Sequence, residues 1–306
     1  MASSVLSYGT LMLFINGTTS MKSYCDDLVM HLPRLNESYI SLNKIYNYLN
    51  KYDPEIQTGN LKLDKINNIK FDNVCFSYNN DRQILSNITI DANNNDKIAI
   101  VGRTGCGKTT LVNLLCKFYD VSKGEILINE KNINDYTLES LRENIGYVMQ
   151  DVVIFDGNIY DNINYAKKDV TKEQIVKICK KLRLHDKIIS FNEGYELDLN
   201  KNQDLFSMGE KQMINFARIM VENPSVVILD EITSSLSYEN EELVKNAIKE
   251  VTKDKICFII AHRLTTIKSC NKIIYMENGN ILENGNHQEL MDLKGKYYEL
   301  VSNNIC

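Results

Sequence analysis

Residues 102–109 combine, in one short run, the residue types that bind a chain of phosphates. The run reads Gly-Arg-Thr-Gly-Cys-Gly-Lys-Thr and directly follows the apolar stretch 98–101, a pattern typical of a strand that enters a tight loop before a helix. Its three glycines let backbone N–H groups turn inward around phosphate, and the helix N-terminus adds the positive end of its dipole. We expect Lys108 to reach the β- and γ-phosphates and the Thr109 hydroxyl to ligate Mg²⁺. The run therefore predicts a site for a nucleoside triphosphate.

The alternative for this run is a glycine-rich turn between a strand and a helix that binds nothing. The flanking strand and helix patterns favour the phosphate site, because both are needed to present the loop to a ligand. We therefore assign nucleotide contacts to Gly102, Arg103, Thr104, Gly105, Cys106, Gly107, Lys108, Thr109 and Thr110.

A second apolar stretch, 226–229, ends in the acidic pair Asp230 and Glu231. In a fold with a phosphate loop, the first acid after such a strand holds Mg²⁺, and we expect this of Asp230. Glu231 beside it is placed to orient and polarise the attacking water. Taken alone, an apolar run that ends in two acids is a strand entering a turn. The phosphate loop upstream favours the catalytic interpretation.

Two polar residues also follow apolar stretches directly. His262 comes after the stretch 256–260, and Gln150 comes after 145–149. Open α/β sheets bind their ligands at the carboxyl ends of strands, where both residues are expected to lie. We expect His262 to sense the γ-phosphate through a hydrogen bond and Gln150 to contact Mg²⁺ or the attacking water. A structural role is the alternative for each.

Ser207, Gly209 and Glu210 stand where a helix is expected to begin, shortly before the acidic pair. In isolation Ser207 is an N-cap residue. The N-terminus of that helix could also meet a second phosphate face.

Apolar stretches that alternate with helical patterns predict an α/β fold with a parallel sheet covered on both faces. Strands are expected at 69–78, 84–90, 98–101, 125–128, 145–148, 226–229, 256–260 and 273–276, with a turn at 79–81. Helices are expected at 108–119, 138–142, 173–182 and 209–221, and the region 151–222 is expected to be mainly helical.

The first 60 residues differ from the rest of the chain. Residues 21–50 place apolar side chains at steps of three and four, which predicts an amphipathic helix. The polar connector 53–64 contains a proline and a glycine and is the best candidate for a domain boundary. A confident membrane span needs about 20 apolar residues, and the nearest approach is the shorter stretch 5–15.

Composition excludes some classes of function. The net charge is −5, and Lys and Arg are dispersed along the chain, so nucleic acid is not an expected partner. The eight cysteines form no C-x-x-C pair and have no metal-binding spacing with His, which indicates reduced thiols of an intracellular compartment.

With these motifs in this order, residues 61–306 resemble the nucleotide-binding domain of an ABC transporter, a phosphate-loop NTPase with a RecA-like parallel core, an antiparallel β subdomain and a helical subdomain at about 151–222. The resemblance implies ATP and Mg²⁺ as ligands and ATP hydrolysis as the activity. It also implies that Tyr78 stacks on adenine, that Gln150 belongs to the Q-loop, that 233–237 is the D-loop and that His262 is the switch histidine. Lys108 would stabilise the transferred charge. Ser207, Gly209 and Glu210 would belong to the signature that meets the ATP of a second subunit.

Finer features resemble the exporter branch of this family. They are the segment 154–159 and the hairpin 279–287. Glu210 is similar to the residue found in mitochondrial half-size exporters of sulfur, glutathione or metal compounds. That likeness implies a membrane-associated protein, with the nucleotide-binding domain on the cytosolic or organelle-matrix side and a mitochondrial or mitosomal inner membrane as one location. Residues 1–60 then resemble the tail of a transmembrane domain and its linker, with a short span, a lumenal turn near Asn16-Gly17 and a last helix.

Two residues depart from the family pattern. Met208 replaces a signature glycine, and Ser237 ends the D-loop where Asp is usual. A transmembrane domain and a second subunit are the expected partners, and a homodimer is favoured over a heterodimer. The alternatives are a soluble ABC-type ATPase without transport and a regulatory subunit that binds nucleotide without hydrolysing it.

Overall fold

The structure is a computed structural model that describes residues 7–51, 59–78, 82–149, 152–165, 170–230, 238–261 and 263–303. The chain divides into two compact units, Met1–Ile56 and Gln57–Cys306. The division falls inside the polar connector 53–64.

Within residues 7–51, the part of the first unit that the structure describes, the chain forms one helix, α1 (Tyr8–Lys51). It includes the amphipathic segment 21–50, as expected, but the turn predicted at Asn16-Gly17 is wrong, because the helix runs through both residues. A single glycine costs a helix only about 1 kcal/mol. The hydroxyls of Thr18 and Thr19, which follow it, donate to helix carbonyls three or four residues back. None of the described helices combines the length and the apolarity needed to cross a membrane.

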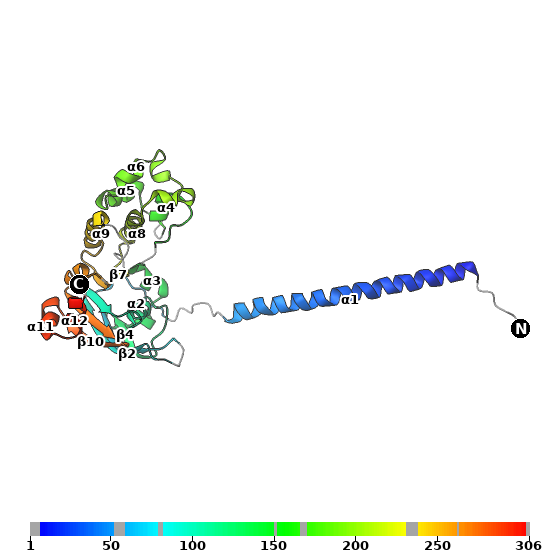
Figure 1. Cartoon of the computed structure of the whole chain (residues 1–306), viewed down its shortest axis with the longest axis horizontal. Helices are drawn as coiled ribbons and strands as arrows, with labels where there is room; N and C mark the ends of the chain where they lie inside the picture. Colours follow the sequence, from blue (N-terminus) through cyan, green and yellow to red (C-terminus); the bar gives the residue numbers. More distant parts are fainter. Residues whose placement is uncertain are drawn as a thin grey trace. The chain divides into compact units, whose positions relative to one another are not determined.

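The second unit is built on two sheets (Figure 1). The antiparallel sheet has the order β2-β1-β4-β5, and the larger sheet has the order β10-β9-β3-β8-β7-β6. In the larger sheet β9, β3, β8, β7 and β6 are parallel, and β10 returns antiparallel to β9. The strands are β1 (Asn68–Phe76), β2 (Leu85–Asn93), β3 (Lys97–Gly102), β4 (Lys123–Ile128), β5 (Lys131–Asn132), β6 (Ile145–Val148), β7 (Val226–Asp230), β8 (Ile256–Ile260), β9 (Lys272–Glu277) and β10 (Asn280–Gly285).

Both faces of the parallel sheet are buried, which explains why its strands are continuously apolar in sequence. Along β3, Ile98 and Ile100 pack into one hydrophobic cluster with residues of the antiparallel sheet. Ala99 and Val101 point the other way, into a second cluster that contains residues of the helical region. The predicted sheet with two covered faces is confirmed.

The helices of this unit lie around the two sheets, and Figure 1 shows α5 and α6 at the end opposite β2, β4 and β10. The region 151–222 is mainly helical in its described parts, as predicted. The α-helices are α2 (Lys108–Leu115), α3 (Leu138–Glu143), α4 (Ile159–Ile163), α5 (Lys172–Lys181), α6 (His185–Ile189), α7 (Leu199–Asn202), α8 (Met208–Glu222), α9 (Tyr238–Val251), α10 (Leu264–Lys268), α11 (His287–Leu293) and α12 (Lys296–Asn303).

Helix α2 is shorter than the predicted 108–119. It ends at Leu115 because Lys117 takes a left-handed backbone conformation with φ 51°. The guanidinium of Arg142 then donates to the carbonyls of Cys116 and Lys117, which lie beyond the helix end. This cap comes from a residue of α3 and is therefore invisible in the local pattern.

Candidate nucleotide-binding site

The predicted phosphate loop connects β3 to α2, as its sequence context requires. Its three glycines all have positive φ: 149° at Gly102, 80° at Gly105 and 108° at Gly107. Gly107 is also the N-cap of α2. Because the cap is a glycine, no cap side chain blocks the first N–H groups of the helix. The loop therefore has the backbone geometry of an anion cradle.

The three glycines are needed for different reasons. A Cβ on Gly102 would collide with the backbone carbonyl of Met276 on β9, and a Cβ on Gly107 would lie 2.6 Å from a methyl carbon of Leu85. A Cβ on Gly105 would meet nothing within 4 Å, so only its backbone conformation demands glycine there. Packing thus fixes both ends of the loop, while its exposed middle faces open space.

Lys108 lies at the centre of this loop. Its side chain is 6% exposed, and its ammonium donates to the carbonyls of Gly102 at 2.8 Å and Arg103 at 3.2 Å. The charge is therefore held inside the curve of the loop. Arg103, Thr104 and Thr109 are exposed beside it, as residues that contact a ligand from solution must be.

Asp230 lies at the same edge of the parallel sheet as the loop. It pairs with Ile260 on β8, and Ile260 pairs with Ile100 on β3. Neighbouring strands lie about 4.8 Å apart, so Asp230 stands roughly 10 Å from Ile100 across the sheet. Gly102 begins the loop two residues beyond Ile100. The structure thus brings together the two motifs that lie far apart in the sequence.

The Asp230 carboxylate has a partner that the sequence did not reveal. The hydroxyl of Tyr147 on β6 donates to Oδ2 of Asp230 at 3.0 Å. Burial raises the pKa of Tyr147, and the neighbouring carboxylate raises it further, so the hydroxyl stays protonated and keeps donating. A tyrosine on the strand next to the acidic pair was the available signal.

Tyr78 follows β1 and is 46% exposed. Its ring makes edge contacts with Phe76 and Tyr119, with centroids 4.9 Å apart in each case. Its hydroxyl lies 3.1 Å from that of Thr110 in α2. A hydrogen bond therefore joins Tyr78 to the helix that follows the phosphate loop. Part of its aromatic ring stays exposed, and an exposed ring of this kind can stack on a base.

The predicted signature segment forms the N-terminus of α8. Ser207 is the N-cap, and its hydroxyl accepts from the N–H of Glu210 while the Glu210 carboxylate accepts from the N–H of Ser207 at 2.7 Å. This reciprocal pair is a capping box. Glu210 therefore has a local structural role here. Gly209 is buried, and Met208 is 49% exposed at the first position of the helix.

Three predicted site residues, Gln150, Glu231 and His262, and the D-loop 233–237 lie outside the described residues. Their roles stay predictions. Their neighbours in sequence, Val148, Asp230 and Ile260, end the adjacent parallel strands β6, β7 and β8.

The described residues fit a nucleotide with Mg²⁺. The loop combines three glycines of positive φ with one ammonium held inside it, the combination expected of a phosphate cradle. Thr109 and Asp230 supply a hydroxyl and a carboxylate, hard oxygen ligands of the kind Mg²⁺ takes.

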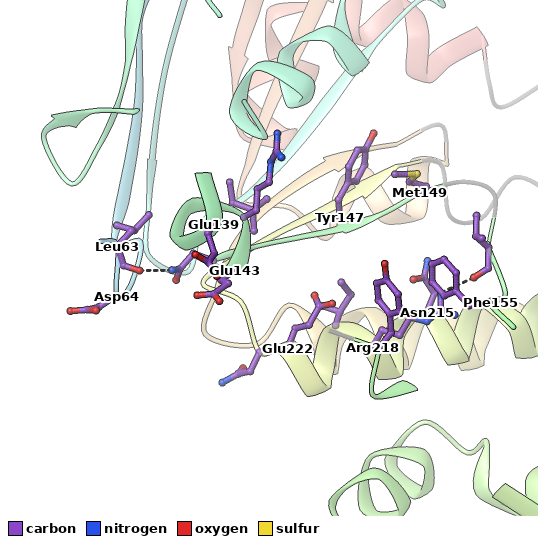
Figure 2. A pocket seen from close by; sticks show the side chains of 17 residues that line it. Leu63, Asp64, Glu139, Glu143, Tyr147, Met149, Phe155, Asn215, Arg218 and Glu222 are labelled. Carbon is purple, nitrogen blue, oxygen red and sulfur yellow. Dashed lines mark hydrogen bonds between the residues drawn. The ribbon is translucent and has the colours of Figure 1, made fainter. Parts of the chain in front are cut away.

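A separate cavity of about 900 Å³ opens on the same unit, between α3, β6 and α8 (Figure 2). Its wall includes Glu139, Tyr147, Phe155, Arg218 and Glu222. It is lined by aromatic, acidic and basic side chains.

Arg218 contacts several of the segments that form this wall. It is buried, and its guanidinium donates to the carbonyls of Val153 and Asn162 at 2.7 Å and to the Asn162 side chain at 2.8 Å. It also lies 4.9 Å from the centre of the Phe155 ring. Burial lowers the pKa of Arg218, and the Glu222 carboxylate opposes that shift. Arg218 thereby joins the segment that contains Val153 and Phe155 to α8, the helix that begins at the predicted signature.

Comparisons with known proteins agree with this geometry. The family model described as ABC transporter matches residues 85–234. The putative multidrug export ATP-binding/permease protein YgaD of Bacillus subtilis is 37% identical over 298 residues, which cover 96% of this chain and 51% of that protein. The putative ABC transporter ATP-binding protein MG015 of Mycoplasma genitalium is 33% identical over 306 residues, which cover 99% and 51%.

A solved structure described as a bacterial Atm1-family ABC exporter with ATP bound is also similar. It has a TM-score of 0.80 and 29% identity over 98% of this chain and 53% of its own. The chain thus spans about half the length of the proteins it matches. These relatives are bacterial and give no support to the mitochondrial or mitosomal placement expected above.

Proposed function

Because the chain carries the ATP-binding domain of the ABC transporter family and its homologues are half-size exporters, we propose that it hydrolyses ATP and that hydrolysis powers export across a membrane. The observation that carries the proposal is the common edge at which the phosphate loop, with Lys108 held inside it, meets Asp230. A fold that only bound an anion would need the loop but not the acid.

In this proposal the loop N–H groups and Lys108 bind the β- and γ-phosphates and offset the charge that develops during phosphoryl transfer. Thr109 and Asp230 hold Mg²⁺, which bridges phosphate oxygens and neutralises their charge when bound. Tyr78 stacks on adenine. Glu231 polarises the attacking water, and Gln150 and His262 sense the γ-phosphate.

We propose that two such subunits close around two ATP molecules, with the Ser207 end of α8 in one subunit facing the phosphate loop of the other. ATP binding would favour the closed pair, and hydrolysis with phosphate release would open it. A homodimer is the simpler arrangement, since this chain carries both halves of such a site. The transmembrane domain is the second proposed partner, and the cavity between α3, β6 and α8 offers it a docking surface.

The cargo follows from likeness alone. Relatives from Bacillus subtilis and Staphylococcus aureus are named as putative multidrug export proteins, and we propose a drug-like organic compound for this chain. The thiol or metal conjugate suggested by Glu210 has weaker support, because that carboxylate is used in the capping box of α8. Helix capping therefore explains the glutamate at position 210 at least as well as the nature of the cargo does.

Two variants test the proposal in the full chain. Lys108→Ala should nearly abolish ATP binding in a nucleotide titration, because it removes the charge inside the loop. Lys131→Ala, on the exposed end of β5, is the matched control. Near-normal affinity in Lys108→Ala would refute the phosphate loop.

Glu231→Gln should keep ATP binding and slow phosphate release by roughly 100-fold or more, the scale of lost general-base catalysis. Turnover within a few-fold of the parent would show that Glu231 is not the group that polarises water. A parent chain that binds ATP and releases no phosphate would instead favour the regulatory, non-hydrolysing subunit.

A further inference from the structure

We infer that Tyr147 is a positioning residue for the metal site: its hydroxyl holds the Asp230 carboxylate in the orientation in which that group would meet Mg²⁺. The inference rests on the proposed role of Asp230. It starts from the hydrogen bond of 3.0 Å between Tyr147 and Oδ2 of Asp230.

The register of the parallel strands makes this contact possible. Tyr147 on β6 pairs with Ile228 on β7, and Asp230 lies two residues further along β7. Side chains two residues apart in a strand project from the same face. Tyr147 therefore points to the face of the sheet that carries Asp230, and its long side chain spans the remaining distance toward the carboxyl end.

The partner strand on the other side fixes the backbone of Asp230. Asp230 pairs with Ile260 on β8, so the residue is held in the ladder on one side while Tyr147 holds its side chain from the other. The Tyr147 ring is half-buried, packs against the hydrophobic cluster on this face of the sheet and forms part of the wall of the cavity, near Met149 (Figure 2). A hydroxyl on a ring packed in this way has little freedom to leave the carboxylate.

The chemistry of the bond suits a supporting role. A hydroxyl that donates to an ionised carboxylate makes a charge-assisted hydrogen bond, which is stronger and more directional than a neutral one. It uses one lone pair of Oδ2, and a carboxylate has about four lone-pair sites on its two oxygens. Groups that orient a metal ligand in this manner typically affect metal affinity by about 10- to 100-fold when removed.

Tyr147→Phe removes the hydroxyl and keeps the ring, so it separates orientation of Asp230 from packing of the cavity wall. The measurement is a Mn²⁺ titration of the full chain with a non-hydrolysable ATP analogue, followed by the electron paramagnetic resonance signal of free Mn²⁺. We expect the half-saturating Mn²⁺ concentration to rise about 10-fold, while the affinity for the analogue without metal stays at the parent value.

The matched control is Tyr136→Phe. Tyr136 also donates its hydroxyl over 3.0 Å, but to the carbonyl of Ile128 in the antiparallel sheet. It reports the cost of losing one buried tyrosine hydroxyl, and its Mn²⁺ affinity should equal that of the parent. Thermal unfolding of both variants checks that each is folded.

A double-mutant cycle tests whether Tyr147 acts through Asp230. If it does, Tyr147→Phe has no further effect on Mn²⁺ affinity in the Asp230→Asn background. The inference would be overturned if Tyr147→Phe changed the half-saturating Mn²⁺ concentration of the parent by less than two-fold. It would also be overturned if Tyr147→Phe had the same effect in the parent and in the Asp230→Asn variant. Analogue binding that is the same with and without Mn²⁺ in the parent would overturn the proposed role of Asp230 itself.

Discussion

The hydroxyl of Tyr78 lies 3.1 Å from the hydroxyl of Thr110, and this contact joins an exposed aromatic ring to the helix that begins at the phosphate loop. Edge contacts with Phe76 and Tyr119 hold the same ring from two further directions. The orientation of Tyr78 is thus set by the protein before any base arrives. A ring that is already oriented loses less conformational entropy on binding, which favours affinity.

Tyr78→Ala should weaken ATP binding by about 1–3 kcal/mol, the scale of stacking between an aromatic side chain and a base. Tyr78→Phe keeps the ring and loses only the contact with Thr110, so its loss should be about 1 kcal/mol or less. Discrimination between ATP and GTP should change little, because stacking tolerates either base. Calorimetric titration of both variants measures this series. Unchanged affinity in Tyr78→Ala would reduce Tyr78 to a residue that packs beside β1.

Arg218→Met should destabilise the domain. The guanidinium donates to the carbonyl and to the side-chain oxygen of Asn162, which is buried, and each of these acceptors left without a donor costs about 1–3 kcal/mol. We expect the free energy of unfolding to fall by at least about 2 kcal/mol. Urea denaturation of the full chain measures it, with Arg183→Met as an exposed control. Equal stability of the two variants would contradict the role given to Arg218.

The sequence predicted well what is local. The phosphate loop follows β3 and opens α2 because Gly102 to Thr109 carry their own turn chemistry, and the apolar runs of β7 and β8 identified the buried strands. The order of the motifs then placed Asp230 near the loop.

The interactions that the sequence did not predict join residues far apart in the chain. Tyr147 meets Asp230 across 83 positions, and Arg218 meets Val153 across 65. No local pattern encodes such a pair, since it depends on which strands become neighbours. The end of α2 at Leu115 also depends on a distant residue, because Arg142 donates to the carbonyl of Lys117 just beyond the helix. The wrongly predicted turn at Asn16-Gly17 shows the opposite error, in which a local turn signal was outweighed by a long helix.

Stability should fall in acid partly through Asp96. Burial opposes ionisation of this carboxyl, but hydrogen bonds from Lys272, from the N–H of Asn93 and from Asn271 outweigh it and hold its pKa below the ordinary value. A group whose pKa is lower in the folded state than in the unfolded state stabilises the fold above its unfolded pKa, near 4. That contribution is lost as the pH falls through the folded pKa.

Asp96→Asn is the matched test of this dependence. At pH 7 the variant should be less stable than the parent by about 1.5–3 kcal/mol, the scale of hydrogen bonds to a charged group. The difference should shrink as the pH falls from 5 toward 2, because the parent loses its charge there and the variant has none to lose. Urea unfolding at several pH values measures the difference. A constant difference across this range would contradict the assignment.

Met208 occupies the first position of α8, where the proposed dimer would bring the phosphates of a second subunit. Its side chain is 49% exposed. The capping box between Ser207 and Glu210 involves the side chains and N–H groups of those two residues only. The frame of the helix start should therefore survive a change at position 208.

In a homodimer both sites contain Met208, so removing its side chain should let both close further. We expect Met208→Gly to raise ATPase activity by a few-fold. Glycine also destabilises a helix by roughly 1 kcal/mol relative to alanine, which works against this gain. Met208→Ala removes the same bulk with a smaller helix penalty, and it should raise activity in the same direction. If both variants leave turnover unchanged, the side chain does not face a nucleotide in this chain's own assembly.

Dimer formation provides a second test of the role of Met208. The Glu231→Gln chain with native Met208 should form dimers in ATP and Mg²⁺ when followed by light scattering, because slow hydrolysis keeps the closed state populated. Dimers that appear only after Met208→Gly is added would instead identify a subunit whose natural partner is a different chain. We expect dimers with the native methionine, since Ser207 and Gly209, the residues expected to contact phosphate, are both present in this chain.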